Sequence, residues 1–434
     1  MDNIHLVLNR FPNEVPPFVE RAEGPYIFLK DGRKLFDSTA GYSACVSVGY
    51  NHPDVIAAIE KQLHKFSYLC SHAFNMDEAG DLAEVMLRDA PKGLDQVYYS
   101  GTSGSDSLEA AMKVSYQIRY NTGKKDKSWF ICRDNSYHGV TLQALAITNI
   151  DVWELYDPLL PKNIGVIPQH NPYTFRKENE TEDQYARRSA DDLEAKILEI
   201  GPDKICAFVA ETMLGQLAGN VPPAANYWKY VREICDKYDV HIILDEVYCG
   251  LGRSGKQYCC NWDGISPDFI AEGKMLAAGY APLSAVVTKR EYRDVIAKGQ
   301  GRVMYGHTHQ GHPLGVVAAL AVQKIMNEPS MLAHINKVGK LMSDKLASAL
   351  GKHPFCKNIR GRGMLISLEY DCPNKNKFGS TIEKRMFDEQ NIIVNSRWHR
   401  SSFSPPCTIT EQDATMLIDR YIDIYKDVAN KWPM

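Results

Sequence analysis

Short apolar runs alternate with amphipathic segments through most of the chain. The runs have the length of strands and most end in polar residues: 96–99, 129–132, 205–211, 242–244 and 268–271. Continuous apolar runs are typical of strands buried on both faces of a parallel sheet, and apolar residues three or four apart predict the helices between them. The alternation therefore predicts an α/β fold with a mostly parallel central sheet.

Both ends of the chain have a different pattern. Two alternating segments surround Asp31-Gly32, which predicts a hairpin. Near the C-terminus, residues 359–370 predict a strand pair and 409–428 a capped helix. Between these ends, the charged stretch 173–185 predicts an exposed excursion, followed by a helix at 190–199.

Three of the apolar runs end at, or shortly before, a side chain that suits one chemistry. These residues are Asp245, Lys274 and Glu211. In an open α/β sheet, ligands bind outside the carboxyl ends of the strands, so we expect these side chains to face one crevice. A buried lysine can hold an aldehyde cofactor as a Schiff base, and a carboxylate keeps a pyridine nitrogen protonated. The combination predicts pyridoxal 5′-phosphate. The alternative is that Asp245 caps a loop and Lys274 is an ordinary solvated lysine.

A small polar loop before a predicted helix is suited to an anion. Gly104 and Ser105 lie at this junction, where free backbone N–H groups, a hydroxyl and the positive helix end favour a phosphate. Simple capping by Ser103 or Ser105 is the alternative. Thr308, in a glycine-flanked loop before the apolar helix 314–326, is a candidate for a second phosphate contact.

Two further patterns have simpler explanations. Gly250-Leu-Gly252-Arg-Ser-Gly255 matches a dinucleotide-binding motif, but no helix follows directly, so we expect a tight turn instead. The three histidines His307, His309 and His312 have no carboxylates or cysteines nearby, so we do not expect a metal site.

Length and composition limit the classes of function. The chain has 434 residues and a formal net charge of −3, from 50 Lys and Arg against 53 Asp and Glu. Without a basic run, this balance disfavours nucleic acid and favours small-molecule partners. Eleven scattered cysteines indicate a reduced, cytoplasmic protein, and we expect neither a signal peptide nor a membrane span.

Taken together, the motifs resemble those of the class III aminotransferases, a fold-type-I family of pyridoxal-phosphate enzymes. The resemblance covers nearly the whole chain. It is carried by SGSDSLEAAMK (103–113), Tyr137-His138-Gly139, ILDEVYCGLGRSGK (243–256), DFIAEGKMLAAGYAPLSAV (268–286) and GHTHQGHPLG (306–315).

The resemblance implies a role for each motif. Lys274 would be the Schiff-base lysine and proton shuttle, and Asp245 would pair with the pyridine nitrogen. The remaining cofactor contacts would be Val247 and Tyr137 on the two ring faces, Gly104, Ser105 and the partner subunit's Thr308 on the phosphate, and His138 and Glu211 nearby.

The resemblance also implies the organisation of the molecule and its activity. It implies a homodimer with active sites at the interface, a large domain (56–305), and a small domain built from 1–55 and 306–434. The activity would be transfer of an amino group from an amine or ω-amino acid to a 2-oxo acid such as pyruvate or 2-oxoglutarate. Racemases or epimerases, aminomutases, decarboxylases and phospho-lyases share the scaffold and are the alternatives. A non-catalytic binding protein is disfavoured because Lys274 and Asp245 are both present.

The substrate pocket departs from the family pattern. Tyr248 takes a place where a smaller or amide residue is common, and no proline follows Glu211. The family's carboxylate-binding arginine aligns with Asn395, so Arg397 and Arg400 are the candidates. We expect Arg397 to bind the carboxylate and to pair with Glu211 otherwise; a position in a surface loop is the alternative. A further candidate substrate contact is Tyr42.

Overall fold

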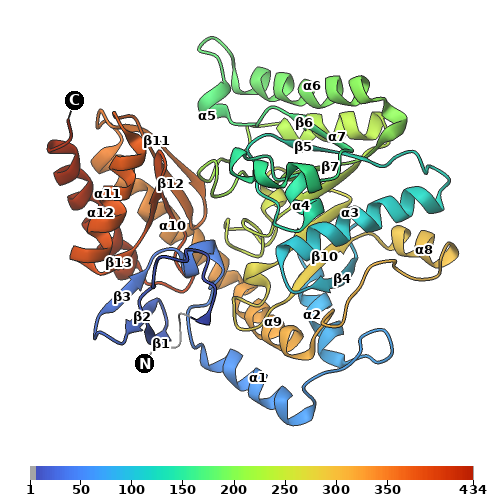
Figure 1. Cartoon of the computed structure of the whole chain (residues 1–434), viewed down its shortest axis with the longest axis horizontal. Coiled ribbons are helices and arrows are strands. Elements are labelled where there is room, and N and C mark those ends of the chain that lie inside the picture. Colours follow the sequence, from blue (N-terminus) through green and yellow to red (C-terminus); the bar gives the residue numbers. More distant parts are fainter. Residues whose placement is uncertain (1–5, 434) are drawn as a thin grey trace.

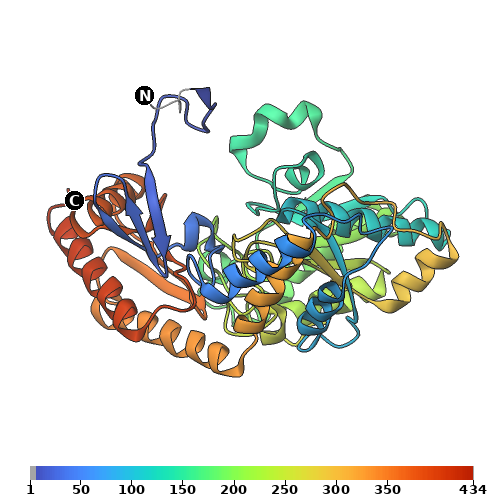
Figure 2. The same ribbon diagram turned by 90° about the horizontal axis from the view of Figure 1, so that it is seen from below.

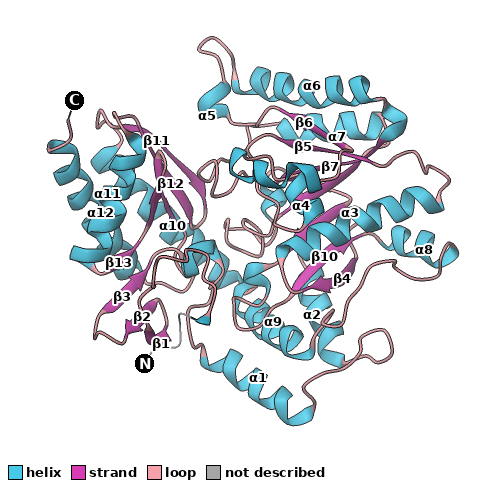
Figure 3. Cartoon of the chain, viewed as in Figure 1, coloured by secondary structure: helices cyan, strands magenta, loops and turns pink. Residues whose placement is uncertain are grey.

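The computed structural model describes residues 6–433, without the side chains of 151–153, as three sheets and the helices around them. Figure 1 shows two units, a larger one on the right and a smaller one on the left that contains both ends of the chain. Figure 3 shows the strands of the larger unit running through its middle, with helices outside them.

The larger unit is organised around a seven-stranded sheet. Its strand order is β4-β10-β9-β8-β7-β5-β6, and only β10 runs antiparallel to its neighbours. The sheet is therefore mostly parallel, as the apolar runs predicted. Its strands are β4 (Gln96–Gly101), β5 (Trp129–Arg133), β6 (Ile164–Ile167), β7 (Ile205–Glu211), β8 (His241–Asp245), β9 (Phe269–Glu272) and β10 (Ser284–Thr288).

Both faces of this sheet are buried. Ile242 and Leu244 of β8 belong to one apolar cluster, while Ile243 between them belongs to the other. This is why β8 has a continuous apolar sequence instead of an alternating one. The surrounding helices are α1 (Pro53–Lys65), α2 (Asp77–Leu87), α3 (Gly104–Asn121), α4 (Leu142–Ala146), α5 (Pro172–Phe175), α6 (Glu182–Ile200), α7 (Tyr227–Lys237), α8 (Arg290–Lys298) and α9 (Pro313–Met326).

Two four-stranded sheets form the smaller unit. One has the order β1-β2-β3-β13 and the other β11-β12-β15-β14. The parallel pairing of β13 with β3 joins the C-terminal part of the chain to the predicted hairpin, which β2 and β3 form. The strands are β1 (Val19–Glu23), β2 (Tyr26–Leu29), β3 (Lys34–Asp37), β11 (Cys356–Arg362), β12 (Leu365–Tyr370), β13 (Ile392–Ile393), β14 (Asn395–Arg397) and β15 (Arg400–Phe403).

Three long helices cover these sheets: α10 (Pro329–Leu350), α11 (Lys375–Gln390) and α12 (Glu411–Asn430). A capping box between Thr410 and Asp413 begins α12, as its sequence predicted. Aromatic rings of Phe378 and Tyr425 pack edge to face in the core beneath these helices, with centroids 5.4 Å apart. Figure 2 shows that the segment leading from residue 6 to β1 extends away from the rest of the smaller unit.

The prediction for residues 173–199 is wrong in part. Helix α6 begins at Glu182, eight residues before the expected start, because Thr181 and Gln184 form a capping box. Tyr185 is only 1% exposed, so the end of the charged stretch belongs to the core. Among residues 6–433, no helix has the length and apolar character needed to cross a membrane.

Candidate active site

The carboxyl ends of β7, β8 and β9 bring three ionisable side chains to one edge of the sheet. Glu211 is paired in register with Asp245, and Asp245 with Ala271, three residues before Lys274. Lys274 lies in a short turn after β9 with φ +40°, a conformation that few residues other than glycine adopt. This strained turn changes the direction of the chain at the residue that carries the amine.

The Lys274 amine has no hydrogen-bond or ion-pair partner in the part of the chain described. Burial lowers the pKa of the amine, and the negative charge of Asp245 opposes this shift. The ammonium nitrogen lies 5.4 Å from the centroid of the Tyr248 ring. A partly desolvated amine with a lowered pKa is suited to act as a nucleophile and a proton carrier near neutral pH.

The Asp245 carboxylate is oriented by two donors. His138 Nδ1 lies 2.8 Å from Oδ2, and the backbone N–H of Val247 donates to Oδ1 at 3.0 Å. Both side chains are buried, with Asp245 6% and His138 2% exposed. The sequence placed His138 near the cofactor but did not reveal this contact, because 107 residues separate the pair.

The first residue of α3 lies against the same edge. A Cβ at Gly104 would be 2.6 Å from a methyl group of Val247, and one at Gly273 would be 3.1 Å from the Gly104 nitrogen. Only glycine fits at this close approach, which places the N-terminus of α3 beside the residue that precedes Lys274. The positive end of the helix therefore faces the strand-end crevice.

Helix capping leaves the Ser105 hydroxyl available to the loop. Ser103, not Ser105, caps α3, in a capping box with Asp106. Ser105 Oγ accepts from the Val140 N–H at 3.1 Å, and a Cβ at Gly139 would lie 2.3 Å from that oxygen. The loop after β5 is thus fixed on the start of α3.

Glu211 holds two loops together at the crevice. Its carboxylate accepts from the backbone N–H groups of Tyr137, at 2.9 Å, and Gly215, at 2.6 Å. Burial raises the pKa of Glu211, partly offset by His138. Tyr137 itself remains 40% exposed.

Comparisons with known proteins agree with this geometry. The family model "Aminotransferase class-III" matches residues 9–425. The chain is a member of the class III aminotransferases.

Relatives and solved structures of similar sequence cover almost the whole enzyme. It is 32% identical over 424 residues to an uncharacterized aminotransferase from Schizosaccharomyces pombe, covering 94% of this chain and 92% of that one. It is 31% identical to gamma aminobutyrate transaminase 3 from Solanum lycopersicum, covering 96% and 82%. The omega transaminase from Pseudomonas jessenii, solved with PMP, aligns with a TM-score of 0.90 at 28% identity, covering 96% and 93%.

The family and these neighbours establish pyridoxal 5′-phosphate as the cofactor and fold type I as the fold of this aminotransferase. The residues fit that cofactor. An unpartnered amine, a carboxylate held in place, and a glycine-backed helix N-terminus meet at one edge, and the buried His138 Nε2 has no partner among the described residues.

Thr308 lies in the loop before α9, and its side chain is exposed. A Cβ at Gly101 would be 2.5 Å from His307 Nε2, so the loop lies beside the end of β4, just before α3. Within residues 6–433 no hydrogen bond to the Thr308 hydroxyl is present.

The expected pairing of Arg397 with Glu211 is wrong. Arg397 donates from Nη2 to Glu383 Oε1 of α11 at 3.0 Å, and its side chain is 56% exposed. Glu211 is occupied by two backbone donors instead. Tyr42 lies close enough to Glu383 and Arg397 for both charges to affect its pKa, which burial raises.

Arg400 is the buried arginine of this region, at 2% exposure. It donates to the Gln216 carbonyl, and no carboxylate in the described chain lies within ion-pair distance of it. Burial and the neighbouring charge of Arg360 lower the pKa of Arg400 to about 10.

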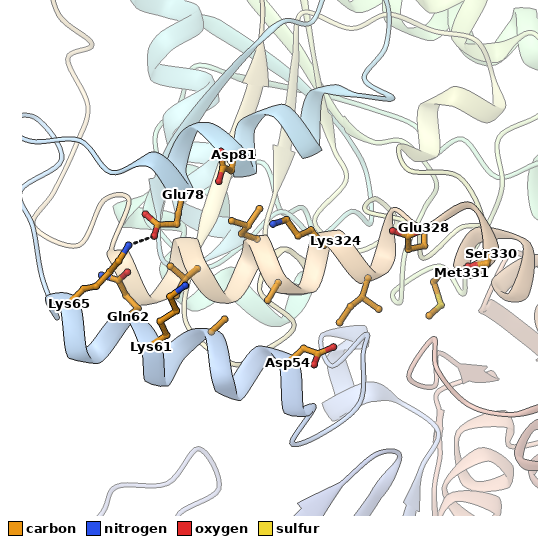
Figure 4. A pocket seen from close by; sticks show the side chains of 15 residues that line it. Asp54, Lys61, Gln62, Lys65, Glu78, Asp81, Lys324, Glu328, Ser330 and Met331 are labelled. Atoms are coloured by element: carbon orange, nitrogen blue, oxygen red, sulfur yellow. Dashed lines mark hydrogen bonds and ion pairs between the residues drawn. The ribbon is translucent and has the colours of Figure 1, made fainter.

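A groove with a volume of about 730 Å³ lies away from this site. It is formed between α1, α2 and α9 and has an apolar floor and charged residues on its rim (Figure 4). The rim includes the ion pair of Lys65 with Glu78, at 2.6 Å. None of its lining residues belongs to the strand-end site.

A buried acid next to Lys274 was missed by the sequence analysis. Glu272 is fully buried, and both carboxyl oxygens are without partners among residues 6–433. Burial, then the charges of Glu246 and Asp245, raise its pKa well above the ordinary value. The folded enzyme therefore holds a proton here that the unfolded chain releases above about pH 4.5.

This acid makes the stability of the enzyme depend on pH. Because the native state binds the extra proton, the free energy of unfolding should fall as pH rises, by up to about 1.4 kcal/mol per pH unit. In Glu272→Gln the part of this decrease that comes from Glu272 should be lost, so the decrease should be smaller, and urea unfolding between pH 5 and 9 measures it. The exposed Glu60→Gln is the matched control, expected to follow the wild type. Parallel curves for Glu272→Gln and wild type would contradict the assignment.

Proposed function

We propose that this aminotransferase moves an amino group from an amine or ω-amino acid to a 2-oxo acid such as pyruvate or 2-oxoglutarate. The observation that carries the proposal is the unpartnered Lys274 amine beside the Asp245 carboxylate. Two relatives support this substrate class by name, a gamma aminobutyrate transaminase and a diaminobutyrate–2-oxoglutarate transaminase from Halomonas elongata, 31% identical over 413 residues.

Each residue at the strand ends has a proposed part in the reaction. When bound, the cofactor supplies a pyridinium ring that accepts an electron pair from the reacting carbon. Asp245, held by His138, keeps the ring nitrogen protonated. Lys274 binds the aldehyde between turnovers and moves a proton to and from the reacting carbon. Burial lowers the pKa of this amine, which favours the neutral form that both tasks require.

The phosphate is proposed to bind at the start of α3. Gly104 and Ser105 supply backbone N–H groups at the positive end of the helix. Val247, which packs against Gly104, would contact one ring face, and Tyr137 the other. Glu211 contributes by fixing the backbone of Tyr137.

Arg400 is the better candidate for the substrate carboxylate. A buried guanidinium without a carboxylate partner is costly, and an acidic substrate would supply the missing charge. Arg397 already has a partner, Glu383, at the surface. Arg397 and Tyr42 would then line the entrance to the pocket.

We further propose a cytoplasmic homodimer with active sites at its interface. Apolar side chains beside the site are open in the single chain, with Val140 57% and Leu142 50% exposed, and a partner would cover them. The free state of all eleven cysteines is consistent with a reducing compartment. The small domain would be built from segments near both ends of the chain and the large one from the segment between them, with α9 on the side of the large domain.

A panel of donors and acceptors tests the reaction. Wild-type enzyme given an ω-amino acid with pyruvate or 2-oxoglutarate should form alanine or glutamate, and Lys274→Ala should form neither. Arg400→Gln should raise KM for 2-oxoglutarate by the equivalent of about 2 to 5 kcal/mol, the usual effect of removing one partner of a buried charge pair.

Arg397→Gln is the matched control in this panel. Because Arg397 is exposed, its removal should change KM by less than the equivalent of about 1 kcal/mol of binding free energy. The proposed function fails if no pair yields a new amino acid. The assignment of the anchor alone fails if Arg397→Gln impairs 2-oxo acid binding more than Arg400→Gln.

The dimer is tested with mixed subunits. Thr308→Ala should weaken retention of the cofactor by about 1 to 3 kcal/mol, the cost of removing a hydrogen bond to a charged group. In a heterodimer of Thr308→Ala and Lys274→Ala subunits, contact across the interface places both changes in one site and leaves the other intact. Differently tagged subunits allow the heterodimer to be isolated, and one active site of wild-type cofactor affinity is expected. A heterodimer without such a site would show contact within the subunit.

A further inference from the structure

Tyr248 lies closer to the reacting amine than its place in the sequence suggested. It follows Asp245 by three residues, and the Lys274 ammonium lies over its ring, 5.4 Å from the centroid. Aspartate, tyrosine and lysine therefore meet at the carboxyl ends of β8 and β9, with the ring forming one boundary of the space around the amine.

The ring is fixed on both sides. A Cβ at Gly215 would be 3.0 Å from Tyr248 Cδ1, so the ring lies on the backbone of the loop that follows β7. Its edge packs against a small apolar cluster that includes Met213 and Leu365. A side chain held between a glycine backbone and a packed cluster has few alternative rotamers.

The hydroxyl end of Tyr248 lies near two buried arginines. Ser404 is close to the hydroxyl, and the charges of Arg253 and Arg400 act on it. The ring therefore extends from Lys274 toward Arg400, the proposed carboxylate anchor.

The distance between the Lys274 nitrogen and the Tyr248 ring limits the space for a substituent of the substrate. A carbon that exchanges a proton with Lys274 must come within about 3 Å of the amine nitrogen. Carbon atoms in contact are about 3.5 to 4.0 Å apart. With the ring centroid only 5.4 Å from the same nitrogen, a substituent that points from that carbon toward the ring has little room.

We infer that Tyr248 is a specificity-determining wall, which admits a hydrogen or a flat carboxylate on its side of the reacting carbon and excludes aryl and branched alkyl groups. The inference rests on the proposed function, in which Lys274 carries the proton. It deepens that function by defining the substrates as terminal amines and amino acids whose bulk points away from Tyr248.

Two substitutions separate the ring from the hydroxyl. Tyr248→Ala removes the wall, and Tyr248→Phe retains it. The measured quantity is the ratio of kcat/KM for 1-phenylpropylamine, branched at the reacting carbon, to that for 3-phenylpropylamine, its unbranched isomer, with pyruvate as acceptor. Tyr248→Ala should raise this ratio by about 10-fold to 200-fold, the range for a single methylene in a hydrophobic pocket. Tyr248→Phe should stay within about threefold of wild type.

Equilibrium binding gives a second readout that does not depend on turnover. Isothermal titration of the holoenzymes with 2-phenylbutanoate and its isomer 4-phenylbutanoate, branched and unbranched acids without an amino group, should show the same change in the ratio of Kd values. The visible absorption of the cofactor confirms that each variant is loaded, and Tyr248→Leu replaces Tyr248→Ala if the latter does not fold.

The inference is overturned if Tyr248→Ala leaves both ratios unchanged, or if Tyr248→Phe changes them as much as Tyr248→Ala does. Activity of the wild type toward 3-phenylpropylamine or another terminal amine distinguishes these results from a failure of the proposed function, in which no donor would react.

Discussion

The active site depends on the parallel register of three buried strands. Backbone pairing sets Glu211 opposite Asp245, and Asp245 opposite Ala271, so the side chains that follow emerge at one edge at fixed separations. A shift of one residue in β8 would turn Asp245 to the other face of the sheet, because side chains alternate along a strand. Burial on both faces prevents such a shift, since Ile242 and Ile243 belong to opposite cores. The chemistry is therefore positioned by the core of the larger unit.

Three acidic side chains are concentrated at the ends of β8 and β9. Asp245, Glu246 and Glu272 lie within two residues of the ends of β8 and β9, and all three are buried. Their environments differ. Asp245 receives two hydrogen bonds at the crevice, and Glu246 accepts from the backbone of Cys259 and Cys260. Glu272 has no partner among the described residues and is expected to remain neutral. A neutral Glu272 would leave Asp245 as the charged carboxylate that is proposed to pair with the cofactor nitrogen.

The strands that carry the site could be predicted from the sequence, because their apolar runs lead to polar residues with an evident chemistry. It did not allow contacts between distant segments to be predicted. The contact of His138 with Asp245 depends on where the loop after β5 folds back onto α3. The pairing of Arg397 with Glu383 depends on how β14 lies along α11, and the motif spacing contains no information on that packing. Tyr248 was visible as a departure from the family pattern, but its position against Lys274 required the structure.

Lys274 and Asp245 are proposed to carry an amino-group transfer, not another reaction of the same cofactor. A half-reaction, in which holoenzyme receives an amino donor without any acceptor, distinguishes the two. We expect the aldehyde absorption of the cofactor to disappear, and one equivalent of oxidised donor and one of pyridoxamine 5′-phosphate to form per active site. Recovery of unchanged pyridoxal 5′-phosphate together with a racemised, rearranged or decarboxylated donor would contradict it.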